Sequence, residues 1–264
     1  KIMKTKGVYV QFSEEAAEST ITLAEQMPMS ELEQYIQSHP YGQYYKYMTA
    51  WYVYARRLLN GNGCPKDPGK ALDYFEELAA AQHNSAALQA GKCYYQGIGT
   101  SCDYHEALKY FEQVSNWPDY TSREGHLWKG KCLLKMKNRE QEAVNCFKQV
   151  MQGIKTPKQI QYAKLKVKNE AQYLLGMCYY YGIGVKENKE TAVQHLKKAA
   201  LGNDANLTAQ YYLAHCYQNG IGTEVNPERA EHWRSMCFEQ NYKKLANEME
   251  EVLGITLKDI CKER

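Results

Sequence analysis

Three seven-residue segments of the chain are nearly identical, and their spacing restricts the possible folds more than any other feature does. They read CYYQGIG, CYYYGIG and CYQNGIG and begin at residues 93, 178 and 216. A related GxG motif begins at Gly61, and the first glycines of the four motifs are separated by 36, 85 and 38 residues. The long interval predicts one more copy, HLWKGKCLLKMKNREQEAVNCF, which lacks the two glycines of the GxG motif and has Met136 at the position of the first. Recurrence at this period is typical of stacked structural repeats.

Small residues recur in register in all five copies. One column lies six residues before the first glycine position: Ala55, Gly91, Gly130, Gly176 and Ala214. A second column lies five residues earlier: Ala50, Ala86, Gly125, Ala171 and Ala209. A third column follows the motif, with a large, mostly aromatic residue three or four positions later: Ala71, Ala107, Ala143, Ala192 and Ala230. Apolar positions at helical spacing around these columns predict two closely packed helices per copy.

The segments between the predicted helices are suited to ending one helix and starting the next. Glycine adopts positive φ at little cost, so each GxG motif predicts the end of a first helix. Asp67-Pro68 and Asn226-Pro227 predict the starts of second helices, and Asp103 opens a predicted capping box in DYHE. Alternation typical of a strand is confined to GVYVQF near the start of the chain. The sequence therefore predicts an all-α fold.

The consensus of the copies, A…LG…Y..G.G…A..YF..A, resembles the Sel1-like repeats, a branch of the tetratricopeptide-like superfamily. The best matches are AALQAGKCYYQGIGTSCDYHEALKYFEQV and AQYLLGMCYYYGIGVKENKETAVQHLKKAALG. The copy over 123–152 lacks the glycines and is more similar to an ordinary tetratricopeptide unit. The resemblance implies a right-handed α-solenoid superhelix of paired antiparallel helices, whose first helices line a concave face. It also implies work as a protein–protein adaptor.

We divide the chain into an N-terminal helical cap, five helix pairs and a C-terminal helical cap. The predicted boundaries are 1–46, 47–83, 84–121, 122–168, 169–205, 206–240 and 241–264. Ser13 to Tyr45 holds six glutamates and no Lys or Arg. Helices predicted there over 13–26 and 30–39 are expected to close one end, because solenoids need polar end caps. The first helix of the fourth pair is predicted to be either unusually long or divided near Lys168.

Four cysteines occupy one position of the repeat: Cys93, Cys132, Cys178 and Cys216. Equivalent positions of successive repeats lie roughly 10 Å apart on helix-packing distances. That separation is too large for a disulfide or for a shared zinc ion, whereas buried cysteine packs as a small hydrophobe. We therefore expect no metal, no cofactor and a reducing, cytoplasmic location. The chain begins at Lys1, which leaves open an upstream signal and delivery into a host cell.

Patterns typical of catalysis are weak in this sequence. The seven histidines are scattered along the chain. The GIG motif ends a helix, whereas a phosphate-binding loop follows a strand and begins a helix. We therefore predict a protein without enzymatic activity.

The predicted binding surface is a stripe on the first helices, at positions expected to face away from the close-packed columns. Its candidate partner-binding residues are Arg56, Gln89, Lys92, Trp128, Lys131, Lys135, Met177, Tyr181, Tyr212 and His215. A solvated helix face is the alternative interpretation. We favour a groove for an acidic or amphipathic segment of a protein partner, because Arg, Trp and Tyr are enriched in binding hot spots.

Positive charge is concentrated in the middle of the chain. Residues 123–168 hold twelve Lys or Arg against three acids, although the net charge of the whole chain is only +3. Complementary charge raises association rates, which supports an acidic partner. Binding of nucleic acid or anionic lipid headgroups is the alternative, and the scarcity of aromatic residues that could stack on bases disfavours nucleic acid. No stretch approaches the ~20 apolar residues of a membrane span, and we expect a monomer.

Overall fold

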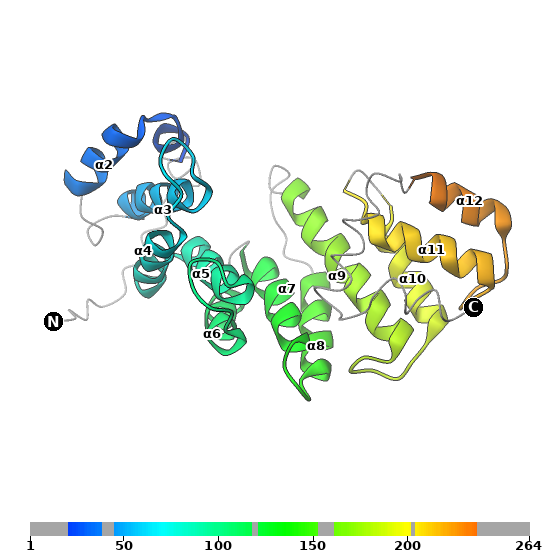
Figure 1. Ribbon diagram of the computed structural model, residues 1–264. Helices are drawn as coiled ribbons and strands as arrows, with labels where there is room; N and C mark the ends of the chain where they lie inside the picture. The colour runs from blue at the N-terminus through cyan, green and yellow to red at the C-terminus, as the bar shows by residue number, and fades with distance from the viewer. Residues whose placement is uncertain (1–20, 39–44, 118–120, 153–160, 202–203, 237–264) are drawn as a thin grey trace. The chain divides into compact units, whose positions relative to one another are not determined.

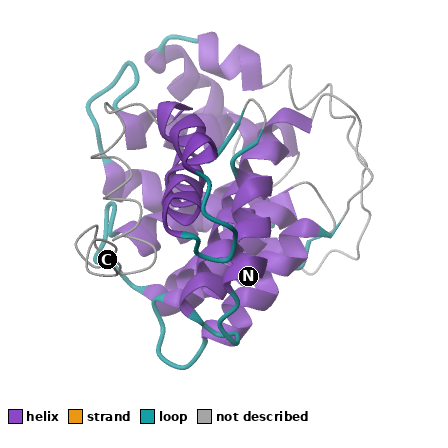
Figure 2. Cartoon of the chain, turned by 90° about the vertical axis from the view of Figure 1, so that its right-hand side faces the viewer, coloured by secondary structure: helices purple, strands orange, loops and turns teal. Residues whose placement is uncertain are grey.

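The structure is a computed structural model that describes residues 21–38, 45–117, 121–152, 161–201 and 204–236 (Figure 1). Its helices are α2 (Met29–Ser38), α3 (Tyr45–Asn60), α4 (Pro68–Ala80), α5 (Asn84–Gln96), α6 (Tyr104–Ser115), α7 (Thr121–Leu134), α8 (Glu140–Met151), α9 (Gln161–Tyr181), α10 (Lys189–Ala199), α11 (Leu207–Asn219) and α12 (Pro227–Met236). Residues 21–26 are also helical, and Figure 2 shows the described residues as helices and loops without strands. The predicted all-α fold is confirmed. The segment GVYVQF and the predicted cap over 241–264 lie outside the described residues.

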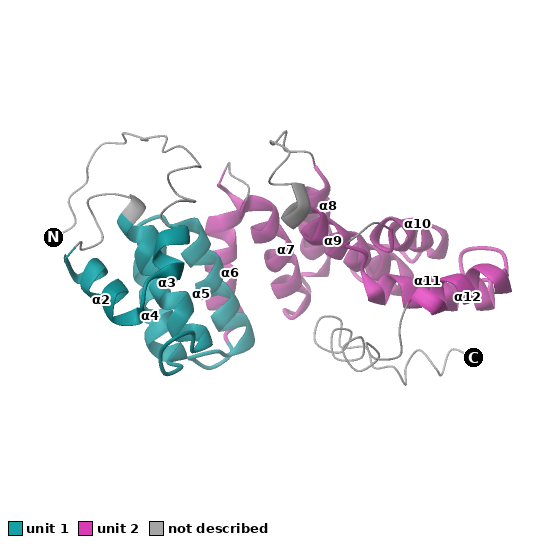
Figure 3. Ribbon diagram, turned by 90° about the horizontal axis from the view of Figure 1, so that it is seen from above, with its two compact units in different colours: residues 1–102 teal, residues 103–264 magenta. Residues whose placement is uncertain are grey.

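The chain divides into two compact units, residues 1–102 and 103–264 (Figure 3). Within unit 1, α3 packs against α2 and α4, and α4 packs against α5. Within unit 2, each helix from α6 to α12 packs against the next one along the chain, and α7 also contacts α9. The boundary falls inside the second predicted repeat, directly after its GxG turn. The repeat pattern predicted no division at this position.

The small-residue columns lie in the core, as the sequence predicted. All fifteen members are buried, and the alanines of the third column are completely inaccessible to solvent. Large side chains of the second helices fill the space beside them: Phe75, Phe111, Phe147 and Leu196, each 0% exposed. Burial of each such side chain stabilises the fold by about 1.5–3 kcal/mol. In the last pair, Trp233 is only half-buried.

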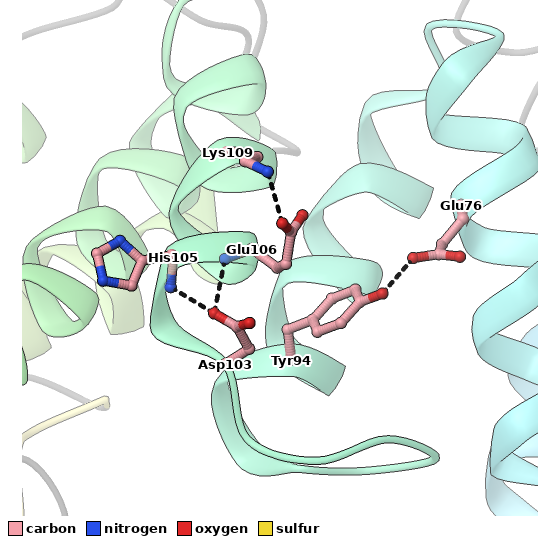
Figure 4. Close-up of polar contacts among 6 residues, drawn as sticks. All are labelled: Glu76, Tyr94, Asp103, His105, Glu106 and Lys109. Carbon is pink, nitrogen blue, oxygen red and sulfur yellow. Dashed lines mark hydrogen bonds and ion pairs between the residues drawn. The ribbon is translucent and has the colours of Figure 1, made fainter.

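Side-chain caps start the second helices where the sequence placed them. Asp67 accepts a hydrogen bond from the backbone N–H of Lys70 at 3.0 Å, with proline as the first residue of α4. Asp103 accepts from two N–H groups in the first turn of α6, at 2.8 and 3.0 Å (Figure 4). The carboxylate of Glu106, predicted to complete a capping box, pairs with Lys109. Helix α2 begins at Met29, one residue before the predicted start.

The two glycines of each GxG turn perform different tasks. The first ends the helix in the left-handed conformation; Gly97, for example, has φ 68° and donates to the carbonyl of Cys93. The second also has positive φ, and in the first turn this glycine, Gly63, lies beside the guanidinium of Arg57. In the three later turns the second glycine lies against the first residue of the preceding second helix. A Cβ at that glycine would come within 2.2–2.4 Å of a backbone oxygen, in the pairs Gly99 with Pro68, Gly184 with Glu140 and Gly222 with Lys189. The sequence predicted the turn but not this close approach between repeats.

Helix α9 settles one alternative that the sequence left open. It runs without a break from Gln161 to Tyr181, so the first helix of the fourth pair is long and is not divided near Lys168. Every residue from Ala171 to Cys178 is buried, so this part of α9 is covered on all sides. A helix buried on all sides shows little amphipathic pattern, because neighbours contact it all round.

Candidate interaction surface

Within unit 1, the predicted stripe lies on α3 and α5. The guanidinium of Arg56 pairs with Glu25 at 3.2 Å, and its side chain keeps 42% exposure. It also lies 5.8 Å from the centre of the Tyr52 ring. Gln89 and Lys92 are half-buried on α5. On the same helix Tyr94 donates a 2.6 Å hydrogen bond to Glu76 of α4 (Figure 4), which fixes the neighbouring turn.

Within unit 2, the stripe on α7 is built around Trp128. Its indole stacks on Phe111 of α6 with ring centres 5.9 Å apart. The ammonium of Lys131, one turn along α7, lies 4.4 Å from the centre of the indole and pairs with Glu170 of α9. Lys131 is only 7% exposed, so this pair joins two first helices inside the fold. Trp128 on α7 and Lys135, the first residue after the end of α7, both stay half-exposed.

The predicted stripe is wrong in part on α9 and α11. Met177 and Tyr212, expected to face outward, are both 0% exposed, whereas Tyr181 and His215 are half-buried. The prediction assumed that one side of each first helix is free. Neighbouring groups cover that side here, so Met177 and Tyr212 belong to the core, as does Lys131.

Tyrosine rings form much of this core. Tyr212 lies 5.8 Å from Tyr180 and 6.5 Å from Tyr173, measured between ring centres, and its hydroxyl is 3.3 Å from that of Tyr181. Burial raises the pKa of Tyr212, so the hydroxyl stays protonated. Lys189 donates to the carbonyl of Tyr180 at 2.7 Å and lies 3.8 Å from the centre of that ring. A cation over an aromatic face adds to the stability of the packing.

The basic segment is partly neutralised by the fold itself. Lys129 pairs with Glu112 at 3.1 Å, and Arg139 grips Glu142 through two hydrogen bonds of 2.8 and 2.6 Å. Arg123 donates to a backbone carbonyl, and the buried Lys131 pairs with the half-exposed Glu170. Within the described part of 123–168, lysines that keep exposure and form no ion pair are Lys135, Lys137, Lys148, Lys166 and Lys168. They lie at helix ends and on a second helix as well as on the stripe.

The repeated cysteines pack in the core as predicted. Cys93, Cys132, Cys178 and Cys216 are buried free thiols. Burial raises the pKa of Cys93 to about 11 and that of Cys178 to about 12, so both stay protonated and unreactive. Cys132 has a polar role that the sequence did not predict, because its thiol donates to the carbonyl of Tyr104 at 3.1 Å. Among the described residues, no group of three His, Cys, Asp or Glu side chains is arranged to hold a metal ion.

Comparison with known proteins gives these repeats a family. The sequence model of the Sel1 repeat matches residues 50–83, 84–114, 169–204 and 207–233. The protein belongs to the Sel1 repeat family. A crystal structure of a Sel1 repeat protein from Oxalobacter formigenes aligns over 90% of this chain and 92% of its own, with a TM-score of 0.63 and 20% identity. A protective antigen of uropathogenic Escherichia coli displaying an SLR fold aligns over 90% of this chain and 59% of its own, with a TM-score of 0.36 and 18% identity.

The match to the family model and the Oxalobacter formigenes structure show a Sel1 repeat α-solenoid fold. Sel1 repeat proteins generally mediate protein–protein interactions. The family model passes over the copy that lacks glycines, although α7 and α8 still form a packed helix pair there. The interacting side chains of that pair, Trp128 and Lys131 among them, therefore lie outside the matched Sel1 repeats. No described helix is both long enough and apolar enough to cross a bilayer.

Proposed function

We propose that the protein is a non-enzymatic scaffold that holds an acidic or amphipathic segment of a protein partner on its first helices. The observation that carries this proposal is the half-exposed indole of Trp128 on α7, together with Lys135 directly after the end of that helix, which keeps exposure and forms no ion pair with a described residue. Contacts with Phe111 and Lys131 hold the indole in place before a partner arrives. Because the Trp128 side chain is already ordered, binding of a partner costs little additional side-chain entropy at this position, which favours a binding hot spot.

The remaining exposed members of the stripe extend the proposed surface within each unit. Tyr181 and His215 provide half-buried polar and aromatic contacts in unit 2. In unit 1, the corresponding contacts come from Arg56, Gln89 and Lys92. Met177, Lys131 and Tyr212 support the surface from behind and do not touch the partner.

Site-directed photocrosslinking in cells tests which helices the partner contacts. A benzophenone amino acid placed at Lys135 is expected to capture a partner, whereas the same probe at the exposed His105 of the second helix α6 is expected to capture none. The captured protein is then purified for binding measurements. Capture at His105 alone would contradict the proposal.

Two substitutions measure the contribution of each group to the affinity. Trp128→Ala is expected to weaken binding by several-fold to a hundredfold, equivalent to about 1–3 kcal/mol. Lys135→Glu is expected mainly to reduce the association rate, with a weaker dependence on salt. His105→Ala, at an exposed position of the second helix α6, serves as the control, and thermal unfolding of Trp128→Ala separates lost binding from lost packing. Unchanged affinity in both variants would overturn the assignment of this surface.

A further inference from the structure

On the side of unit 2 formed by second helices, one histidine joins three successive helices. His195 of α10 stacks on Tyr179 of α9, with ring centres 5.5 Å apart and an interplanar angle of 5°. Its Nδ1 lies 2.7 Å from Oε1 of Gln172 on α9, and the Gln172 amide donates to the sulfur of Met151 on α8 at 2.9 Å. Because the amide hydrogens point to the sulfur, Oε1 accepts from the ring. Nδ1 therefore carries the proton, and Nε2 is the atom that can take up another.

Two helices each bring one lysine to the network around this ring. Lys198 lies about one turn after His195 on α10, and Lys148 lies about one turn before Met151 on α8. Lys148 of α8 and Lys198 of α10 are exposed, and neither forms an ion pair with a described residue. Partial burial, together with these two ammonium groups, lowers the pKa of His195. The groups that α9 presents to the ring, Tyr179 and Gln172, carry no charge. The histidine is therefore held neutral at a place where positive charge is already concentrated.

The nearby carboxylates do not balance this charge. Glu142 of α8 pairs with Arg139, and Glu170 of α9 pairs with Lys131. Glu140 and Glu190 lie eight residues before the two lysines on their helices, about 12 Å along the axis, which exceeds the ~8 Å over which exposed charges act at physiological ionic strength. Glu190 is nearer to His195, about 7.5 Å before it along the axis, but five residues turn a helix by about 500°, so the two side chains lie on different sides of α10. Among the described residues, no carboxylate forms an ion pair with Lys148 or Lys198.

We propose that Lys148, His195 and Lys198 form a binding site for the phosphoryl group of a phosphorylated protein segment. The two lysines supply fixed charge, and proton uptake at Nε2 of His195 supplies a third charge with a directed donor. A phosphoryl group suits this arrangement because it carries nearly two negative charges and several acceptor oxygens. A single cluster of three cations favours one phosphoryl group over a nucleic-acid backbone, which needs a track of cations. The site is independent of the first-helix surface proposed above.

Proton and anion binding at this site must strengthen each other equally, which makes the proposal measurable. Histidine NMR follows the titration of His195 with and without inorganic phosphate as the probe. Phosphate is expected to raise the pKa of His195, and a rise of about one unit corresponds to about tenfold tighter phosphate binding by the protonated form. His232, exposed on α12, serves as the internal control and is expected not to respond. An equal response of both histidines would overturn the site.

Substitution of the lysines tests the assignment of the charges. In Lys148→Gln/Lys198→Gln, the pKa of His195 is expected to rise without phosphate and to respond no further when phosphate is added. Lys186→Gln, at another exposed lysine, is the matched control and is expected to behave as the wild-type protein. A phosphate response that persists in the double variant would overturn the proposal.

A peptide comparison identifies the source of the phosphoryl group. A phosphoserine peptide is expected to shift His195 at lower concentration than inorganic phosphate does, and its unphosphorylated form is expected to have no effect. A response to inorganic phosphate without one to the phosphopeptide would contradict a protein ligand.

Discussion

The third and fourth helix pairs, α7–α8 and α9–α10, solve the same packing problem by different means. In the fourth pair, Gly182 ends the first helix with φ 70°, and Gly184 brings the turn against the first residue of α8. In the third pair the turn is shorter, and Asn138, with φ 61°, supplies the only positive-φ residue between α7 and α8. The first residue of the preceding second helix is contacted there by the thiol of Cys132, which donates to Tyr104.

The comparison shows that the contact between repeats is maintained although the motif is not. One pair places a glycine backbone at the start of the preceding second helix, and the other places a side-chain donor there. The GxG motif is therefore one of two ways to make this contact. A sequence search that looks for the glycines passes over a repeat that makes the contact with a side chain. Three substitutions test how these contacts stabilise the two pairs, and each is compared with a substitution at a matched position.

The largest effect is expected at the second glycine of the fourth pair. Gly184→Ala should lower the free energy of unfolding by about 3 kcal/mol or more, because left-handed backbone strain adds to a Cβ lying 2.4 Å from the backbone of Glu140. Gly182→Ala should cost about 1 kcal/mol, since it introduces the same strain while its Cβ meets neighbours at 3.5 Å. Urea unfolding measures both. Equal losses would show that the close approach contributes nothing beyond turn geometry.

An intermediate effect is expected where first and second helices cross. A Cβ at Gly130 would lie 2.4 Å from the ring of Phe147, so Gly130→Ala should lower the free energy of unfolding by about 2 kcal/mol. A Cβ at Gly176 would lie 3.0 Å from the more flexible Leu196. Gly176→Ala should be roughly neutral, because better helix propensity offsets the crowding.

A double-mutant cycle checks the cause of the loss at Gly130. Phe147→Leu removes the ring and should recover part of the stability lost in Gly130→Ala. If the changes in the free energy of unfolding caused by the two substitutions are strictly additive, contact with the Phe147 ring is not the cause of the loss.

The smallest effect distinguishes the two cysteines. Cys132→Ser keeps a donor for Tyr104 and should change the free energy of unfolding by less than about 1 kcal/mol. Cys178→Ser places a hydroxyl in a fully buried position, where no described group forms a hydrogen bond with the thiol, and should cost about 1–3 kcal/mol. Thermal unfolding under reducing conditions compares them. If Cys132→Ser is the more destabilising variant, the thiol–carbonyl contact is not what secures the third pair.

Much of the fold follows from the sequence because its signals are local. The buried columns, the Asp67 and Asp103 caps and the helix ends at GxG each depend on residues within one repeat. The environment of the first helices depends on residues far away in the chain. Lys131 is buried because Glu170 reaches it from another repeat, and no periodicity in α7 reveals that partner.

The helices that carry the candidate residues were predictable from the sequence, but the exposure of those residues was not. Trp128 and Lys135 remain available as predicted, whereas Met177 and Tyr212 are enclosed by neighbouring rings and helices. A stripe on a helical projection shows which residues share a side, but the residues that cover that side come from neighbouring repeats. The polar network around His195 likewise joins three helices and has no local signature.

The contact made by Gly184 also affects whether the number of repeats in such a protein can change. It joins backbone to backbone, so it does not require a particular side chain on the preceding repeat. A duplicated or deleted unit would regenerate the same junction without compensating substitutions, provided that its turn keeps the second glycine. The third pair no longer brings a glycine to its predecessor, yet it still offers the backbone of Glu140 to its successor. A unit of this kind can be tolerated among the repeats. It lacks the GxG motif, but the next repeat can still form its contact with the first residue of the second helix.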